Sequence, residues 1–297
     1  MVVSERKPDW LKIRPPGGEN YLAIKGLLRS LKLHTVCEEA RCPNVAECWG
    51  SGTATVMLMG DICSRSCRFC HVKSGKPSAL DPDEPTKVAE AVAKLGLTYV
   101  VLTSVNRDEL SDGGANHFAR TVENIKGLNS RILVEVLVPD FQGDEAAIKR
   151  ITSSGADVFA HNVETVGRLT PMARDRKASY QQSLHVLKRF KTLAPLVHTK
   201  SSLMVGLGET EGEMHQAMDD LRLAGVDILT IGQYLRPSAW HLPVHQFVTP
   251  ENFEAYERAG LERGFAFVAA GPLVRSSYRA GEKFIENILR GKQRAIH

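Results

Sequence analysis

Apolar, β-branched runs alternate with amphipathic stretches along most of the chain. Seven such runs predict buried strands, at 55–59, 98–103, 131–137, 157–161, 198–204, 226–231 and 265–269. The stretches between them have helical spacing, near 84–95, 115–128, 143–154, 179–193, 211–224 and 250–263. Asp144 suits a helix start, and Gly96 and Gly155 suit helix ends. This alternation predicts an α/β fold with a parallel barrel or an open barrel-like sheet, and the strand candidates do not decide between six and eight barrel strands.

The pattern changes before the first predicted strand. Residues 15–18 read Pro-Pro-Gly-Gly, which predicts an extended arm and a turn. Apolar residues at helical spacing then predict a short helix within 21–33.

Composition indicates an ordinary soluble globular protein. The chain has 297 residues, of which 43% are hydrophobic and 24% charged. No apolar run approaches the ~20 residues that span a bilayer. Residues 1–16 are charged and lack the apolar centre of a secretory signal. We therefore expect a cytoplasmic protein without a membrane partner and without disulfides.

Charge separates two interpretations of the C-terminal stretch. The net charge is +4, which by itself is too small to indicate a nucleic-acid partner. The closing residues are more basic, with Glu282 and Glu286 set against Arg275, Arg279, Lys283, Arg290, Lys292 and Arg294. Either this is a solvated helix face, or it is a docking face for an acidic partner protein.

Candidate chemistry concentrates in residues 63–70. Cys63, Cys67 and Cys70 have the spacing C-x3-C-x2-C, and they directly follow a predicted strand. Thiolates suit iron–sulfur clusters, and three of them leave one iron of a 4Fe–4S cluster open to an outside ligand. A zinc site with His71 as a fourth ligand is the alternative that spacing leaves open.

Another group of three cysteines lies upstream; it is called the first triad, and Cys63, Cys67 and Cys70 are called the second triad. Cys37, Cys42 and Cys48 have the spacing C-x4-C-x5-C, which lacks the short gaps usual in zinc motifs. Two triads suggest two clusters that each lack one cysteine, although one combined zinc site stays open. A zinc-bearing nucleic-acid module would explain the cysteines and the mild basicity, but not a long β/α domain with polar loops after its strands.

The second triad has an aromatic residue, Phe69, just before Cys70. With this residue it resembles the signature of the radical S-adenosylmethionine superfamily. This resemblance implies that Cys63, Cys67 and Cys70 hold a 4Fe–4S cluster whose fourth iron is chelated by S-adenosylmethionine. It also implies that an electron from the cluster cleaves the sulfonium and releases a 5′-deoxyadenosyl radical.

The two triads together closely resemble the lipoyl synthase family, and the likeness extends over roughly residues 20 to 280. The first triad contains Pro43-Asn44, and similar segments follow at 103–108, 161–165, 232–235 and 275–278, the last reading Arg-Ser-Ser-Tyr. The resemblance implies a partial (β/α)6 barrel over 51–270. It implies an N-terminal extension, 1–50, with the auxiliary cluster cysteines and a C-terminal extension, 271–297, with the Arg-Ser-Ser-Tyr motif. Biotin synthase and methylthiotransferases place their auxiliary ligands elsewhere.

The resemblance also implies a reaction and its participants. Two sulfur atoms are inserted at C6 and C8 of an octanoyl group on a lysine of a lipoyl-carrier domain, such as an E2 subunit or the glycine cleavage H protein. Two 4Fe–4S clusters and S-adenosylmethionine serve as cofactors, and a ferredoxin or flavodoxin supplies electrons. In the family a motif serine ligates the auxiliary cluster, which here implies Ser277 rather than Ser276.

Polar residues that follow the predicted strands should gather at one rim of the barrel, because reactive groups lie at the carboxyl ends of barrel strands. Asn162 and Glu164 suit the ribose hydroxyls of S-adenosylmethionine, and Lys200 or Arg236 could pair with its carboxylate. The alternatives are a structural network at the rim and ordinary salt bridges. Arg107 and Asp108 could contact the substrate or pair with each other.

Overall fold

One sheet organises the chain. In the computed structural model, which describes residues 7–12, 17, 19–40, 42, 44–50 and 55–277, this sheet has eight strands in the order β1-β2-β5-β6-β7-β8-β9-β10. The strands are β1 (His34–Thr35), β2 (Thr55–Leu58), β5 (Tyr99–Ser104), β6 (Leu133–Leu137), β7 (Val158–Ala160), β8 (His198–Val205), β9 (Ile228–Gln233) and β10 (Phe267–Gly271). All neighbours pair in parallel except β1, which is antiparallel to β2. The sheet is open, since β1 and β10 are its two edges.

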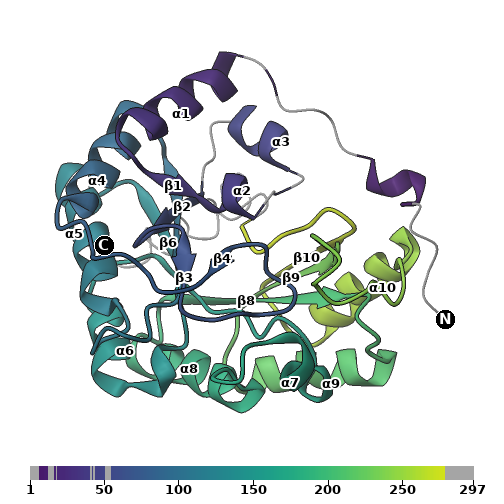
Figure 1. Cartoon of the computed structure of the whole chain (residues 1–297). Coiled ribbons are helices and arrows are strands. Elements are labelled where there is room, and N and C mark those ends of the chain that lie inside the picture. The colour runs from purple at the N-terminus through teal and green to yellow at the C-terminus, as the bar shows by residue number, and fades with distance from the viewer. Residues whose placement is uncertain are drawn as a thin grey trace.

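Six helices cover the outside of this sheet. They are α4 (Glu84–Lys94), α5 (Ala115–Leu128), α6 (Glu145–Thr152), α8 (Tyr180–Leu193), α9 (Glu211–Leu223) and α10 (Pro250–Glu262). In Figure 1 they form an arc from α4 at the left, past α6, α8 and α9, to α10 at the right, with the strands inside it. Six strand–helix units followed by one further parallel strand, β10, confirm the partial (β/α)6 barrel. The seven strands and six helices predicted for the barrel all occur, with ends shifted by at most two residues, while the helix predicted within 21–33 runs from Glu19 to Ser30.

Three of the six barrel helices, α6, α8 and α9, begin at a side-chain cap. The carboxylate of Asp144 accepts from the N–H of Ala147 at 2.7 Å, so this predicted start is confirmed one residue before α6. A capping box at α9 joins the Thr210 hydroxyl to the N–H of Glu213, whose carboxylate accepts from the Thr210 N–H. Short elements fill the connections: η1 (Asp9–Leu11), β3 (Ile62–Cys63), β4 (Lys73–Ser74), η2 (Phe141–Gly143), η3 (Gly167–Leu169) and α7 (Thr170–Ala173).

The interior of the barrel is filled at its amino end and hollow at its carboxyl end. Tyr99, Leu133 and Val158 form a small cluster where the strands begin. Just above it, the buried ammonium of Lys200 lies 2.9 Å from the carboxylate of Glu135, which also accepts from the Tyr99 hydroxyl at 2.6 Å. The space beyond these layers is left for the functional site.

The N-terminal segment closes the open side of the sheet. It contains α1 (Glu19–Ser30), α2 (Val36–Glu39) and α3 (Val45–Gly50), which lie together at the top of Figure 1. Trp49 is fully buried, and its ring centroid lies 5.0 Å from that of Tyr21. The Asn44 amide donates to the carbonyl oxygen of Leu273 at 2.6 Å. Residues from the two ends of the chain therefore meet between the edges of the sheet.

Some predictions fall outside the described residues. These are the Pro-Pro pair at 15–16, Tyr278 and the basic residues from 279 to 294. Within the residues described, none of the helices has both the length and the apolar character needed to cross a membrane.

Candidate functional site

A cavity of about 810 Å³ occupies the carboxyl ends of the strands. Its walls come from the loops after β2, β5, β6, β7 and β9, from the carboxyl half of β8, and from the two ends of the described chain. It brings together most of the predicted site residues: Cys37, Cys42, Cys63, Cys67, Cys70, Asn162, Glu164, Arg236, Ser276 and Ser277. Cys48 lies on the adjacent α3, and all six cysteines are free thiols. The predicted convergence of polar loops on one rim is confirmed.

Backbone N–H groups point at two sulfurs of the second triad. Cys63 Sγ accepts from the N–H of Arg65 at 3.4 Å and from that of Asn106 at 3.3 Å. Cys67 Sγ accepts from the N–H of Asp175 at 3.3 Å. Such donors stabilise the negative sulfur of a cluster-bound thiolate and help to set the reduction potential of the cluster. The triad therefore fits an iron–sulfur cluster in its donor set and in its surroundings.

Two thiols of this triad, those of Cys67 and Cys70, ionise poorly without a metal. Burial raises the pKa of Cys67 to about 11 and that of Cys70 to about 12, and repulsion between the three sulfurs adds to the shift in Cys70. Coordination to iron would supply the positive charge that three thiolates in this position need.

The first triad faces the same cavity from the N-terminal segment. Burial, and then the proximity of Cys42, raise the pKa of Cys37 to about 11. Burial also raises the pKa of Cys42, where the nearby Arg275 guanidinium acts in the opposite sense. Arg275 begins the Arg-Ser-Ser-Tyr motif, so the motif lies next to this triad. Ser277 is therefore brought to the same wall as the triad, although it is far away in sequence.

A close backbone contact holds the motif segment in place. A Cβ atom on Gly232, at the end of β9, would lie 2.0 Å from the carbonyl oxygen of Val274. Only glycine allows the chain before Ser277 to approach the strand so closely.

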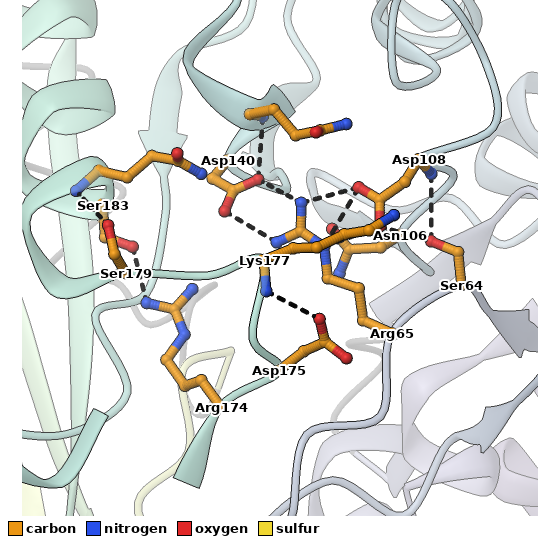
Figure 2. Close-up of polar contacts among 12 residues, drawn as sticks. Ser64, Arg65, Asn106, Asp108, Asp140, Arg174, Asp175, Lys177, Ser179 and Ser183 are labelled. Carbon is orange, nitrogen blue, oxygen red and sulfur yellow. Dashed lines mark hydrogen bonds and ion pairs between the residues drawn. The ribbon is translucent and has the colours of Figure 1, made fainter. Parts of the chain in front are cut away.

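Arg65 clamps the second triad to the barrel (Figure 2). Its guanidinium makes paired hydrogen bonds to Asp140 at 2.7 and 2.8 Å, and others to Asp108 at 2.8 to 3.2 Å. Asp108 follows β5 and Asp140 follows β6, so one side chain ties the cysteine loop to two strand ends. Burial alone would raise the pKa of Asp140, but the hydrogen bonds and charge of Arg65 outweigh it and hold the pKa at about 2.

Neighbouring contacts complete this clamp. The Ser64 hydroxyl donates to Asp108 at 2.9 Å, and Lys177 lies 3.4 Å from the same carboxylate. Arg107 and Asp108 do not pair with each other, because Asp108 is bound by Arg65 and Arg107 pairs with Glu109 at 2.6 Å.

Glu164 is held in a strained backbone conformation. Its φ is +70°, a region that non-glycine residues seldom occupy. Its N–H donates to the carbonyl oxygen of Ser202 at 3.1 Å, and its own carbonyl accepts from Met204 at 2.8 Å. Burial raises the pKa of its carboxyl group, while Arg174 and Asn162 oppose the shift. This conformation places a carboxylate and an amide side by side on the wall, where ribose hydroxyls could be bound.

Arg174 also lines the cavity, and sequence reasoning missed it. Its Nη1 donates to the Ser183 hydroxyl at 2.7 Å, as Figure 2 shows. Ser183 in turn donates to Nε2 of His161 at 2.8 Å, and His161 Nδ1 donates to the carbonyl oxygen of Val138 at 2.8 Å. The guanidinium is therefore fixed in orientation beside Cys67. It follows a single turn of helix, α7, and not a strand, so the rule of strand ends could not find it.

His161 should make stability depend on pH. Burial, and then Arg174, lower its pKa from 6.5 to about 4, so the unfolded chain takes up a proton that the folded chain refuses. Stability is therefore lost as the pH falls from the pKa that His161 has in the unfolded chain toward its lower pKa in the folded chain. We expect a loss of about 1 kcal/mol between about pH 7 and about pH 5.5 from this group. Urea unfolding of the parent and of His161→Gln at both pH values checks this prediction. Between the two pH values the variant should lose about 1 kcal/mol less stability than the parent. An equal loss in both proteins would contradict the assignment.

The structure places the two predicted cations differently. Lys200 is buried, is paired with Glu135 and lies outside the cavity lining, so it is not brought to the site. Arg236 lines the cavity, but its Nε donates to the carbonyl oxygen of His241 at 2.9 Å and its Nη2 to that of Ala239. Of the three cations, Arg174 is the one that faces the cavity beside the second triad.

Comparisons with known proteins agree on one family. A model of the radical SAM superfamily matches residues 57–221, and a model of the N-terminal domain of lipoyl synthase matches residues 3–42. The chain is 60% identical to a lipoyl synthase of Anaeromyxobacter dehalogenans, with 95% of this chain and 96% of that protein covered. It is 57% identical to a lipoyl synthase of Thermus thermophilus (96% and 88% covered) and 56% identical to a mitochondrial lipoyl synthase of Drosophila mojavensis (98% and 82% covered).

Solved structures share the fold. SuiB of Streptococcus suis, bound to the precursor peptide SuiA, aligns with a TM-score of 0.58 at 10% identity, over 77% of this chain and 52% of that one. HydG, a maturase of the [FeFe]-hydrogenase, aligns with a TM-score of 0.56 at 14% identity, over 71% and 50% of the two chains. At these identities the likeness concerns the fold alone.

Proposed function

The chain belongs to the lipoyl synthase family of the radical SAM superfamily, and on this premise we propose that its two cysteine triads divide the reaction between them. The reaction is the insertion of two sulfur atoms at C6 and C8 of an octanoyl group carried on a lysine of a lipoyl domain. The cofactors of this family are S-adenosylmethionine and two 4Fe–4S clusters.

The triads are assigned by their neighbours. Cys63, Cys67 and Cys70 hold the cluster that cleaves S-adenosylmethionine, while Cys37, Cys42 and Cys48 hold the auxiliary cluster with Ser277 as its fourth ligand. When bound, the cluster at the second triad would supply the electron for cleavage, and the auxiliary cluster at the first triad would supply the sulfur. One observation carries the division: both groups of thiols open on the same cavity, and the carboxylate and guanidinium side chains of Glu164 and Arg174 lie beside the second triad.

Side chains beside the second triad suit S-adenosylmethionine. The carboxylate of Glu164 accepts hydrogen bonds from the ribose hydroxyls, and the amide of Asn162 donates to them. Arg174 pairs with the carboxylate of S-adenosylmethionine. Orientation by Ser183 and His161 means that little side-chain freedom is lost when the carboxylate binds. In this proposal Arg174 takes the role that the sequence suggested for Lys200, and Arg236 is a second cation in the cavity lining.

The remaining wall suits an acyl chain. Met57, Leu137 and Met204 line the cavity that both triads face. An extended octanoyl-lysine arm would lie along these side chains, with its unreactive C–H bonds exposed to both clusters and shielded from water.

Several expectations accompany this function. We place the barrel at 51–270, with extensions at 1–50 and 271–297 that bring the auxiliary ligands together. The carrier is an E2 subunit or a glycine cleavage H protein, and a ferredoxin or flavodoxin donates the electrons. The compartment is the cytoplasm, with no nucleic-acid or membrane partner.

The test is the mass of an octanoyl-lysine peptide after anaerobic incubation with cluster-loaded protein, S-adenosylmethionine and dithionite. We expect two hydrogens to be replaced by two sulfurs, together with release of 5′-deoxyadenosine. Release without a change in peptide mass would show a radical enzyme that acts on another substrate. If neither changes in fully loaded protein, the proposed assignment fails.

A further inference from the structure

A short chain of contacts leads from the surface to the loop that carries the second triad. The Trp240 indole is 55% exposed, and its ring meets that of His241 edge-on with centroids 5.0 Å apart. His241 is buried and donates from Nε2 to the carbonyl oxygen of Cys70 at 2.9 Å. Its Nδ1 accepts from the Ser238 hydroxyl at 2.8 Å, which fixes the ring and its tautomer. One imidazole thus joins an exposed aromatic ring to a proposed cluster ligand.

Arg68 lies between two segments of the surrounding surface. Its N–H donates to the carbonyl oxygen of Ala173 at 2.9 Å, and its own carbonyl accepts from the N–H of Leu242 at 3.0 Å. Met172, 44% exposed, belongs to the first of these segments, and Trp240 belongs to the second. An exposed cation of the cysteine loop therefore lies between two segments that each carry an exposed apolar side chain.

The same surface is cationic. Arg68 and Arg236 are both exposed. Both guanidinium groups oppose the pKa shift of Tyr234, which burial raises to about 12, so both lie near its hydroxyl. We call the surface formed by Arg68, Met172, Arg236 and Trp240 the Trp240 patch.

Few carboxylates offset these cations. Within the described segments 64–71, 171–177 and 235–249, Asp175 is the one acidic residue, and it accepts from the N–H and hydroxyl of Ser66 at 3.0 and 3.3 Å. Next to it Arg176 is exposed, and so is Lys177, whose ammonium lies 3.4 Å from the buried carboxylate of Asp108. The patch and its border therefore present a positive surface to a partner.

We propose that the Trp240 patch docks a small acidic ferredoxin and that Trp240 and His241 conduct its electron to the cluster at Cys70. This inference rests on the proposed function. One electron leaves the reduced ferredoxin, which is oxidised, and enters the 4Fe–4S cluster of the second triad, which is reduced; no bond or proton moves in this step. Cleavage of S-adenosylmethionine consumes one electron at a time, and a ferredoxin is an obligate one-electron carrier.

Three features make this surface suitable. Electron-transfer rates fall exponentially with distance, and Trp240 and His241 provide a short route of ring contact and hydrogen bond. Exposed Trp and Arg side chains are the types that carry most binding energy in interfaces. Opposite charge speeds encounter and orients an acidic partner, which gives binding a strong dependence on salt.

The test uses cluster-loaded full-length protein and a reduced acidic [2Fe–2S] ferredoxin under anaerobic conditions. Calorimetry gives the Kd, and stopped-flow absorbance gives the rate of cluster reduction without S-adenosylmethionine. We expect Arg68→Glu to raise the Kd about tenfold at low salt. We expect Trp240→Ala to slow reduction at saturating ferredoxin by about tenfold, whereas Trp240→Phe retains most of the rate.

Matched controls lie on other faces. Arg131→Glu reverses an exposed charge just before β6, at the amino end of the barrel, and Leu223→Ala truncates a side chain that is 81% exposed. Both should leave the Kd and the reduction rate unchanged. With dithionite in place of ferredoxin, Arg68→Glu and Trp240→Ala should cleave S-adenosylmethionine as the parent does. This control distinguishes a variant with a damaged cluster from one that has lost only ferredoxin binding.

Three results would overturn the proposal. The first is a Kd that ignores both salt and Arg68→Glu. The second is tighter binding of a flavodoxin than of the ferredoxin by the parent protein. The third is a rise in the KM for an octanoylated carrier domain in the patch variants with unchanged ferredoxin kinetics, which would make the patch a carrier-docking surface. Loss of activity with dithionite in the parent itself would instead count against the proposed function.

Discussion

Replacement of Cys63 with alanine is expected to abolish cleavage of S-adenosylmethionine and, with it, sulfur insertion. Replacement of Cys37 should stop sulfur insertion and leave cleavage near the parent level. The reason is that the two thiols belong to separate groups, carried by different parts of the chain that line one cavity, and the donors to Cys63 Sγ come from the barrel loops at Arg65 and Asn106. Chromatography of 5′-deoxyadenosine and the mass of an octanoyl-lysine peptide, measured in the same reaction, separate the two effects.

Serine variants extend this comparison. Ser277→Ala should behave like Cys37→Ala, while Ser276→Ala, which changes a neighbour on the same wall, should retain sulfur insertion. Equal loss of cleavage in the Cys63 and Cys37 variants would count against two separate sites. The opposite order of the two serine variants would move the ligand to Ser276.

The second large effect is expected at the Arg65 clamp. Arg65→Met removes the guanidinium that Asp108 and Asp140 share. The side chains of these two aspartates are only 6% and 0% exposed. Breaking a buried ion pair on one side costs about 3–5 kcal/mol, because an unpaired charge stays buried. We expect a loss of this size in urea unfolding and a lower iron content per chain. Arg65→Lys keeps the charge but cannot bridge two carboxylates with one planar group, so it should recover only part of the loss.

An exposed pair provides the matched control. Arg150 makes a two-pronged contact with Glu123 at 2.6 and 2.9 Å, with side chains 30% and 44% exposed. Arg150→Met should cost less than about 1 kcal/mol, because water already solvates both groups. Equal effects at Arg65 and Arg150 would show that the clamp does not hold the cysteine loop.

The fold was largely readable from the chain. Parallel strands buried on both faces need continuous apolar runs, and the helices between them need one apolar face, so both leave a periodic signal. Asp144 shows how local this information is, since its cap requires contact only with Ala147, three residues away. The number of strands was not decided in this way, because β10 has the pattern of the six before it and only pairing with β9 makes it the edge.

The candidate site was readable only in part. Cysteine spacing and strand ends indicated both triads, Asn162 and Glu164, because these residues are marked by their neighbours in sequence. Asp140 carried a usable signal, since it follows the strand 133–137 in the same way. Arg174 carried none, because its orientation depends on Ser183 and His161 from other elements. Lys200 was suggested for its charge alone, but its side chain meets Glu135 in the layer below the cavity.

What the sequence by itself determined is the set of elements, the two groups of thiols and the family to which they belong. Each of these depends on spacing between near neighbours, which the order of residues states directly. The tertiary structure decided that the two triads share one cavity, that Arg65 fastens one of them to β5 and β6, and that Trp240 stands over Cys70 through His241. Those contacts join residues from 43 to 171 positions apart, and at such separations only the packing of the barrel selects which side chains meet.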